Sequence, residues 1–246
     1  MIVISAGLPK SGSGLLFNLT NDLLETAGNT GIRDLRERHD LENILKHLNC
    51  NIGTPDWAAL RPLMPLHFRG HRFVVKTHQG PNATVRRLMR LGIIRATFIY
   101  RDPRDVVLSA MDHGRRIRGE GKSHTFAKCH TVEDTVPLAM KWLEDTTPWI
   151  KESRVLCFRY EDLLTEPLHQ LERLAAFLKI DCQSAGIDLA GLYNKYDVSR
   201  NSGADTQGLH WNRGIAGRFR REMSEKHLAF STRAFREYLP ALGYEE

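Results

Sequence analysis

The sequence predicts an α/β protein, with a single domain over residues 1–246 and a mostly parallel central sheet flanked by helices. Short apolar runs alternate with amphipathic helical stretches along the chain, as they do when a covered parallel sheet is built from strand–helix units. The composition, with 41% hydrophobic and 26% charged residues in 246, is that of an ordinary folded domain. A chain of this length can bury one sizeable core.

The elements of the first hundred residues follow from apolar runs and from helical spacing. "MIVISA" (1–6) is an unbroken β-branched apolar run and predicts a buried strand. Leucines at helical spacing then predict a helix that stops near Gly28. "RFVVKTH" (72–78) predicts a second strand, and "NATVRRLMRLG" (82–92) predicts the helix after it. The leucines of the first helix are Leu15, Leu16, Leu19, Leu23 and Leu24.

The second part of the chain continues the alternation. "RATFIYRDP" (95–103) predicts a third strand, with Asp102 as the N-cap and Pro103 as the first residue of the next helix, which carries "RDVVLSAM". A helix is predicted over 133–152, a strand over "RVLCFRYED", and an amphipathic helix over "EPLHQLERLAAFLKI". Three stretches lack clear periodicity and are expected to carry loops over the site: 29–71, 113–132 and 181–218.

Charge and cysteine usage narrow the class of protein. The formal net charge of +6 favours anionic partners without saying which kind. The four cysteines are isolated and have no metal-ligand spacing, so free thiols and no bound metal are expected. The sequence has no secretory leader and no apolar run of about 18 residues, which predicts a cytoplasmic protein without a membrane span. The cysteines are Cys50, Cys129, Cys157 and Cys182.

A Gly/Ser turn with one lysine joins the first strand to the first helix. In "AGLPKSGSG", Gly12 and Gly14 let the backbone approach a ligand, and Ser11 and Ser13 offer hydroxyl groups, at the positive end of a helix. A Walker A loop would carry its lysine after the second glycine, whereas Lys10 precedes it, which counts against ATP or GTP hydrolysis. The turn predicts an anion site; the alternative is a purely structural turn with a solvated lysine.

A second cationic motif ends the third strand. In "YRDPRDVVLS", Arg101 lies at the carboxyl end of the strand, and Ser109 follows eight residues later on the helix. An arginine can fork onto two phosphate oxygens, and a serine two turns on can donate to the same group. Taken with the first loop, these residues suggest one ligand that carries phosphates at both ends.

These motifs together resemble the P-loop-like sulfotransferases that use 3′-phosphoadenosine 5′-phosphosulfate (PAPS). "PKSGSG" is similar to the loop that wraps the 5′-phosphosulfate in that family, and "YRDPRDVVLS" to its 3′-phosphate motif, with Arg101 and Ser109 in the contacting positions. "RYEDLLTEP" resembles a later strand whose Tyr160 falls on a nucleotide-site position. "NRGIAG" resembles a late loop, in which Arg213 and Gly214 are the matching residues. The resemblance implies a P-loop nucleotide-hydrolase-like fold and PAPS as co-substrate.

This chain departs from the family pattern at several positions. Leu15 stands where many members have a tryptophan against the adenine, Asn212 replaces an arginine, and Arg218 stands where an aspartate is common. Gly14 takes a position that is often threonine. Tyr196 is a candidate replacement aromatic for the adenine, with a packing role as the simpler interpretation.

The chemistry of sulfuryl transfer requires a base and positive charge at one point. In "FVVKTHQGP", Lys76 and His78 leave the same face of an extended strand end, and histidine can take a proton near neutral pH. The segment matches the K-T-H segment of the family, which implies that His78 is the catalytic base. The resemblance further places Lys10 at the bridging oxygen and Lys76 at the sulfuryl oxygens, with no metal required.

Other functions remain open from the sequence. Asp102 could be a magnesium ligand of an ATP-dependent small-molecule kinase, although an N-cap explains the same residue. Arginine-rich runs at 86–90, 115–118 and 218–221 suggest a nucleic-acid-binding module, but without interleaved aromatics no nucleic acid is expected. A nucleotide-binding protein without turnover is a third alternative. The acceptor would be a hydroxyl of a small molecule, lipid or sugar. Trp57, Leu60, Met64 and Phe68 could line its pocket or anchor a loop.

Overall fold

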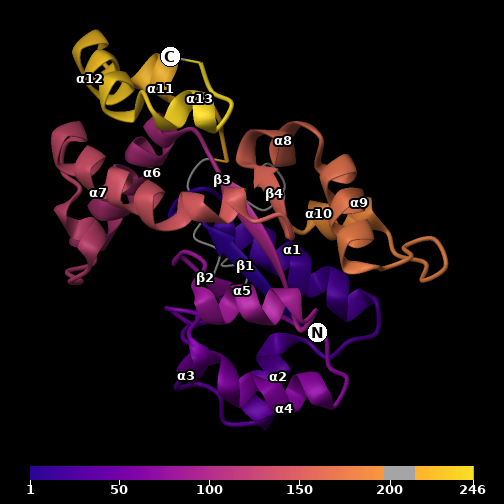
Figure 1. The fold of residues 1–246 in the computed structure, drawn as a ribbon. Helices are drawn as coiled ribbons and strands as arrows, with labels where there is room; N and C mark the ends of the chain where they lie inside the picture. Colours follow the sequence, from indigo (N-terminus) through magenta and orange to yellow (C-terminus); the bar gives the residue numbers. More distant parts are fainter. Residues whose placement is uncertain (197–213, 246) are drawn as a thin grey trace.

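Four parallel strands form the centre of the protein, seen in a computed structural model that describes residues 1–196 and 214–245 (Figure 1). Their order across the sheet is β2-β1-β3-β4, and each pairs in parallel with its neighbours. The mostly parallel sheet predicted from the sequence is therefore confirmed. The strands are β1 (Ile2–Gly7), β2 (Phe73–Thr77), β3 (Ile94–Tyr100) and β4 (Val155–Arg159).

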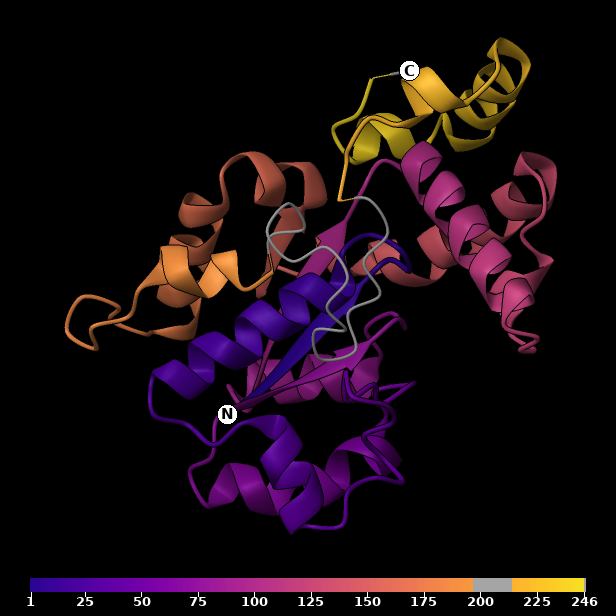
Figure 2. The ribbon, with the colours of Figure 1, turned by 180° about the vertical axis from the view of Figure 1, so that it is seen from behind.

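The second strand lies on one side of β1 and the third on the other, and this change of side places helices on both faces of the sheet. Right-handed crossovers put α1 (Ser13–Thr26), between β1 and β2, on one face. The next crossover runs the other way, so α5 (Ala83–Arg90), between β2 and β3, covers the opposite face, as Figures 1 and 2 show. The carboxyl ends of β1 and β3 flank the resulting switch point, where open α/β sheets bind ligands.

The remaining helices form three groups along the chain. One group precedes β2, another lies between β3 and β4, and the third follows β4 (Figure 1). The first consists of α2 (Ile32–Arg38), α3 (Trp57–Leu60), η1 (Arg61–Leu63) and α4 (Met64–Phe68). The second consists of α6 (Pro103–Gly119), η2 (Thr125–Lys128), α7 (Val132–Thr146) and η3 (Thr147–Lys151). The third consists of α8 (Tyr160–Thr165), α9 (Pro167–Leu178), α10 (Leu189–Asn194), α11 (Phe219–Glu222), α12 (Glu225–Phe235) and α13 (Tyr238–Ala241). The last three of these helices lie beside α6 and α7.

Three expectations about the elements need correction. The fourth strand stops at Arg159, because the acidic residues after it begin α8 instead of extending the sheet. The helix expected over 133–152 is α7 followed by the 3₁₀ turn η3, where Pro148 has no N–H to continue the α-helical pattern. The stretch 29–71 holds four short helical elements, each too brief to produce a visible period.

All four cysteines, which lie in the described part of the chain, are free. Among residues 1–196 and 214–245, no helix is both long and apolar enough to cross a membrane.

Candidate active site

The loop after β1 leaves the start of α1 open. Gly12 is the N-cap of α1 in the left-handed conformation (φ 87°), and no side chain caps the first turn. The first backbone N–H groups of a helix have no partner within the helix, so an uncapped N-terminus attracts anions. Lys10 also has a positive φ, 66°, which is uncommon for a residue with a side chain and is typical of functional loops. The predicted anion loop thus has the backbone geometry that such a site requires.

The two serines of this loop have different surroundings. The Ser11 hydroxyl donates to the main-chain carbonyls of Leu8 (2.6 Å) and Ile99 (3.0 Å), so it ties the loop to β3. Ser13 is the first residue of α1, and its side chain leaves no room for a larger residue at Gly7, whose added Cβ would lie 2.6 Å from that of Ser13. Gly14 follows within the first turn of α1.

Tyr160 joins the loop to the end of the third strand. A Cβ added to Gly12 would lie 2.5 Å from Cδ2 and 2.7 Å from Cε2 of the Tyr160 ring. The same ring also contacts the guanidinium of Arg101, which lies 4.6 Å from the ring centroid. The two motifs that the sequence placed about ninety positions apart are therefore separated by one buried tyrosine ring.

We expect Gly12→Ala to disrupt this junction. The new methyl group would force the Tyr160 ring away, and the left-handed conformation would add strain, together costing about 1–3 kcal/mol of unfolding free energy. Chemical denaturation measures that loss. Gly28→Ala is the matched control, because Gly28 has a similar φ of 82° but open space around its Cα. A cost for Gly12→Ala no larger than that of Gly28→Ala would contradict the tight contact.

His78 is held in one tautomer beside the loop. Its Nδ1 lies 2.7 Å from the carbonyl oxygen of Gly7, which can only accept a hydrogen bond, so Nδ1 carries the proton. Nε2 is then unprotonated and has no hydrogen-bond partner among the described residues. Lys76 of β2, two residues before His78, is buried, and strand pairing places it opposite Ser5 of β1. This arrangement presents a proton-accepting nitrogen at the edge of the switch point.

Burial and mutual repulsion depress the pKa values of the site cations. Desolvation, followed by the charges of Arg116 and Arg101, lowers the pKa of Lys10 to about 8. Desolvation and the Lys10 charge lower the pKa of Lys76 to about 8. For His78, desolvation and the charge of Lys76 lower the pKa to about 3. Positive charges that are held close together in a partly buried site favour the binding of an anion.

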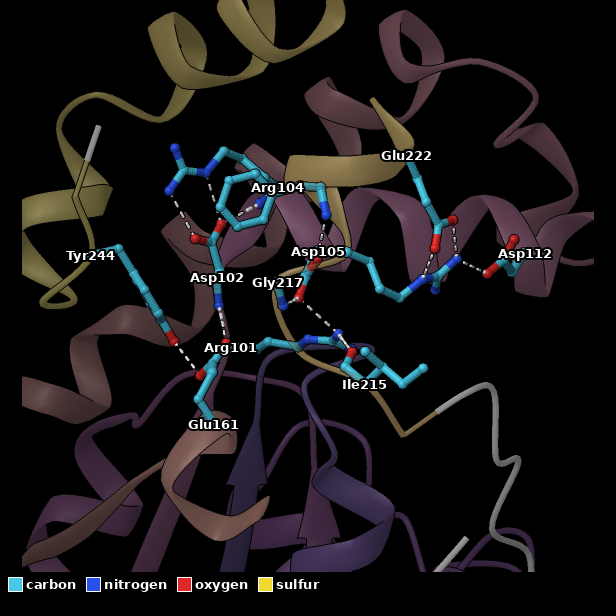
Figure 3. Close-up of polar contacts among 12 residues, drawn as sticks. Arg101, Asp102, Arg104, Asp105, Asp112, Glu161, Ile215, Gly217, Glu222 and Tyr244 are labelled. Atoms are coloured by element: carbon cyan, nitrogen blue, oxygen red, sulfur yellow. Dashed lines mark hydrogen bonds and ion pairs between the residues drawn. The ribbon is translucent and has the colours of Figure 1, made fainter. Parts of the chain in front are cut away.

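Arg101 is fixed by a buried carboxylate. Its Nη2 donates to Asp105 Oδ2 (2.9 Å) and to the Ile215 carbonyl (2.5 Å), as Figure 3 shows. Its Nε is buried without a hydrogen-bond partner, and a buried unsatisfied donor commonly marks a missing ligand or water. Ser109 lies two turns along α6, and its hydroxyl makes no hydrogen bond to the described residues. Both groups are therefore available to an anion.

The late glycine loop is attached to the same carboxylate. Asp105 Oδ2 accepts from the N–H of Gly217 (2.7 Å) and Oδ1 accepts from the N–H of Phe219 (3.0 Å). Gly214 (φ 64°) begins this described stretch, whereas Arg213, predicted as a binding residue, lies outside the described residues. Arg218 forks onto Glu222 and also donates to Asp112 at 2.8 Å, so it ties α11 to α6.

Several other residues singled out in the sequence have structural roles. Both oxygens of Asp102 accept from Arg104, and Oδ1 also caps α6, so the N-cap interpretation is confirmed. Tyr196 is buried and donates to Asp22 Oδ2 (2.8 Å), in agreement with a packing role. The four residues suggested for an acceptor pocket differ in burial: Leu60 and Met64 are buried, whereas Trp57 and Phe68 are exposed.

Two groups essential to the geometry received no role from the sequence. Asp105 is fully buried and links Arg101 to the late loop, and its spacing of four residues from Arg101 on a helix start is the signal that could have indicated the pair. The carbonyl of Gly7 sets the His78 tautomer, and no sequence pattern reports a contact made by a backbone oxygen.

A parallel sheet with an uncapped glycine loop and converging cations at its switch point defines an α/β protein whose switch point suits an anionic ligand. Residues 2–243 match the family model described as "Sulfotransferase domain". Because that match spans nearly the whole chain, the protein belongs to the sulfotransferase domain family.

Individual relatives agree with this assignment. The chain is 26% identical over 202 residues to Cytosolic sulfotransferase 8 of Arabidopsis thaliana. The matched region covers 76% of this chain and 58% of the plant protein. Mouse sulfotransferase SULT7A1, complexed with PAP, has a similar fold, with a TM-score of 0.61 and 16% identity over 96% of this chain and 82% of that one. Retinol dehydratase, in complex with androsterone and the inactive cofactor PAP, also has a similar fold. Its TM-score is 0.59 and its sequence identity is 19%, over 100% of this chain and 82% of that one. The P-loop-like fold expected from the resemblance is confirmed.

Proposed function

We propose that this protein transfers the sulfuryl group of PAPS to a hydroxyl group of a small-molecule, lipid or sugar acceptor. The observation that carries the proposal is the convergence of Lys10, Lys76 and Arg101 from three strand ends around one uncapped helix start. Repulsion among cations is a cost that a protein tolerates where a multiply charged anion offsets it. Family membership and PAP-bound neighbours of the same fold support this choice over the kinase and nucleic-acid alternatives.

The residues present fit a donor with phosphates at both ends. The amides of Gly12, Ser13 and Gly14 and the Lys10 ammonium would hold the 5′ end. Arg101, through its unpartnered Nε, and Ser109 would hold the 3′-phosphate. Tyr160 packs between Gly12 of the first loop and Arg101. Gly214 and Arg213 would complete that side, as the resemblance implies. Leu15 is buried, so it offers no surface to an adenine ring.

His78 would act as the general base. When bound, PAPS supplies a sulfuryl group attached to a phosphate leaving group. Nε2 of His78 would take the proton of the acceptor hydroxyl, while the Gly7 carbonyl keeps the other nitrogen protonated. Lys76 would offset charge on the sulfuryl oxygens and Lys10 charge on the leaving oxygen. Burial, and after it the lysine charges, depress the pKa of His78. The negative charge of the donor would offset the contribution of the lysines, so the histidine becomes a stronger base once the donor is in place.

A labelled-sulfate screen tests the proposal. The purified protein is incubated with ³⁵S-PAPS and cell extract in the presence of a metal chelator, and labelled products are identified by mass. We expect transfer to one or a few hydroxyl compounds, with release of PAP. ATP-dependent phosphorylation in a parallel incubation with labelled ATP and Mg²⁺, together with no sulfation from PAPS, would overturn the proposal in favour of a kinase.

The lysine pKa values predict how donor affinity depends on pH. Both lysines have pKa values lowered to about 8, so they lose their positive charge as pH rises through 8. We expect the affinity for PAP to begin to fall between pH 7 and 8 and to be about tenfold or more weaker by pH 9.5. Calorimetric titration at constant ionic strength measures this. In Lys76→Met only Lys10 of the two lysines still titrates, so the affinity for PAP should fall less steeply with pH. Constant affinity up to pH 10 would contradict the shared site.

A further inference from the structure

The turn that carries Arg101 is supported from outside the donor loops by the first residues of α8. Strands β3 and β4 pair as far as Tyr100 opposite Arg159, and the residues that follow the two strands also contact each other. Tyr160 lies under the Arg101 guanidinium, and Glu161 Oε1 accepts from the backbone N–H of Asp102 (3.2 Å). The peptide bond between Arg101 and Asp102 is therefore held by the Glu161 carboxylate.

The second oxygen of that carboxylate is held by a residue from the far end of the chain. The Tyr244 hydroxyl donates to Glu161 Oε2 at 2.7 Å, as Figure 3 shows. The Tyr244 ring is buried, with the Arg159 guanidinium 4.2 Å from its centroid and the Tyr100 ring edge-on at 6.3 Å. Arg159 Nε lies 3.7 Å from Oε2, too far for a hydrogen bond, so among the described residues it is the Tyr244 hydroxyl that donates to that oxygen.

The segment around Tyr244 is itself anchored to the same turn. Arg104, which forks onto Asp102, also donates to the carbonyl of Glu245 (2.7 Å). Tyr244 and Glu245 therefore contact both sides of the Arg101–Asp102 turn, one through Glu161 and the other through Arg104. Such double attachment restricts how the turn can move relative to α8.

We propose that Tyr244 is a positioning residue for the 3′-phosphate subsite, acting through Glu161 on the Arg101–Asp102 turn. This inference rests on the proposed function, because it assumes that Arg101 binds the 3′-phosphate. Loss of the Tyr244 hydroxyl lets Glu161 turn away from the Asp102 amide, so that the Arg101–Asp102 turn is no longer held in one position. The consequence is weaker binding of the 3′-phosphate alone, while the 5′ end of the donor is bound as before.

The test compares two ligands, PAP and adenosine 5′-monophosphate, which lacks the 3′-phosphate. In Tyr244→Phe we expect the Kd for PAP to rise about three- to tenfold and the Kd for the monophosphate to stay within about twofold. Tyr238→Phe is the matched control, since it removes a tyrosine hydroxyl from the same region, on α13, without any hydrogen bond to Glu161. Equal changes for both ligands, or no change for PAP, would overturn the inference.

A second pair of variants keeps the test decisive if Tyr244→Phe folds poorly. Glu161→Gln retains an oxygen for the Asp102 amide and is expected to bind PAP within about threefold of the unmodified protein. Glu161→Ala is expected to show the PAP-selective loss, and adding Tyr244→Phe to it should cause no further loss. Additive losses would mean that Tyr244 does not act through Glu161. An unmodified protein that binds neither PAP nor PAPS would instead contradict the proposed function.

Discussion

Replacing His78 by alanine should reduce turnover with PAPS by about 10²–10⁴-fold, the range expected when a general base is removed. The affinity for PAP should change little, because His78 is uncharged at neutral pH, its pKa having been lowered to about 3 by burial and by the nearby lysine charges. Turnover is measured with the acceptor found in the labelled-sulfate screen, and PAP binding by calorimetry on the same preparations.

His78→Asn separates the chemical role of His78 from its contact with the loop. Asparagine keeps an N–H donor that can reach the Gly7 carbonyl but offers no basic nitrogen, so it should be as slow as the alanine variant. His169→Ala, on the exposed side of α9, controls for the loss of a histidine and should leave turnover unchanged. Near-normal turnover of both His78 variants would remove this residue from the mechanism.

Replacing Arg101 by alanine should weaken PAP binding by about 10²-fold or more, because a buried charged partner of a phosphate is lost. The loss for adenosine 5′-monophosphate should be much smaller, since that ligand lacks the 3′-phosphate. Asp105 would still accept from the N–H groups of Gly217 and Phe219, so the late loop keeps its anchor. Titrations of both ligands into both proteins measure the difference.

Two further variants distinguish geometry from charge. Arg101→Lys keeps the charge but cannot fork onto two oxygens, so we expect an intermediate affinity for PAP. Arg87→Ala removes one positive charge from the exposed side of α5 and should alter PAP binding by less than about twofold. If Arg101→Ala weakened both ligands equally, Arg101 would not be a 3′-phosphate contact.

The strands and the motif positions were predictable because they depend on neighbours in the sequence. Ile2–Gly7 is an apolar run with a Gly/Ser turn after it, and the Asp102–Pro103 pair starts α6 where expected. The end of the fourth strand was not predictable, because "RYED" suits either a strand end or the first turn of α8. The contact with Gly12 and Arg101 that Tyr160 makes depends on packing between separate elements.

The sequence by itself determined which chemical groups the protein has at its strand ends: a lysine in a glycine turn, a lysine and a histidine two residues apart, and an arginine before a helix start. Only the tertiary structure decided how these groups are held. Asp105 reaches Gly217 across 112 positions, and Tyr244 reaches Glu161 across 83. The physical reason is that local patterns reflect interactions within one strand or helix, whereas such contacts exist only after the parallel sheet has aligned its carboxyl ends and the last helices have packed beside them.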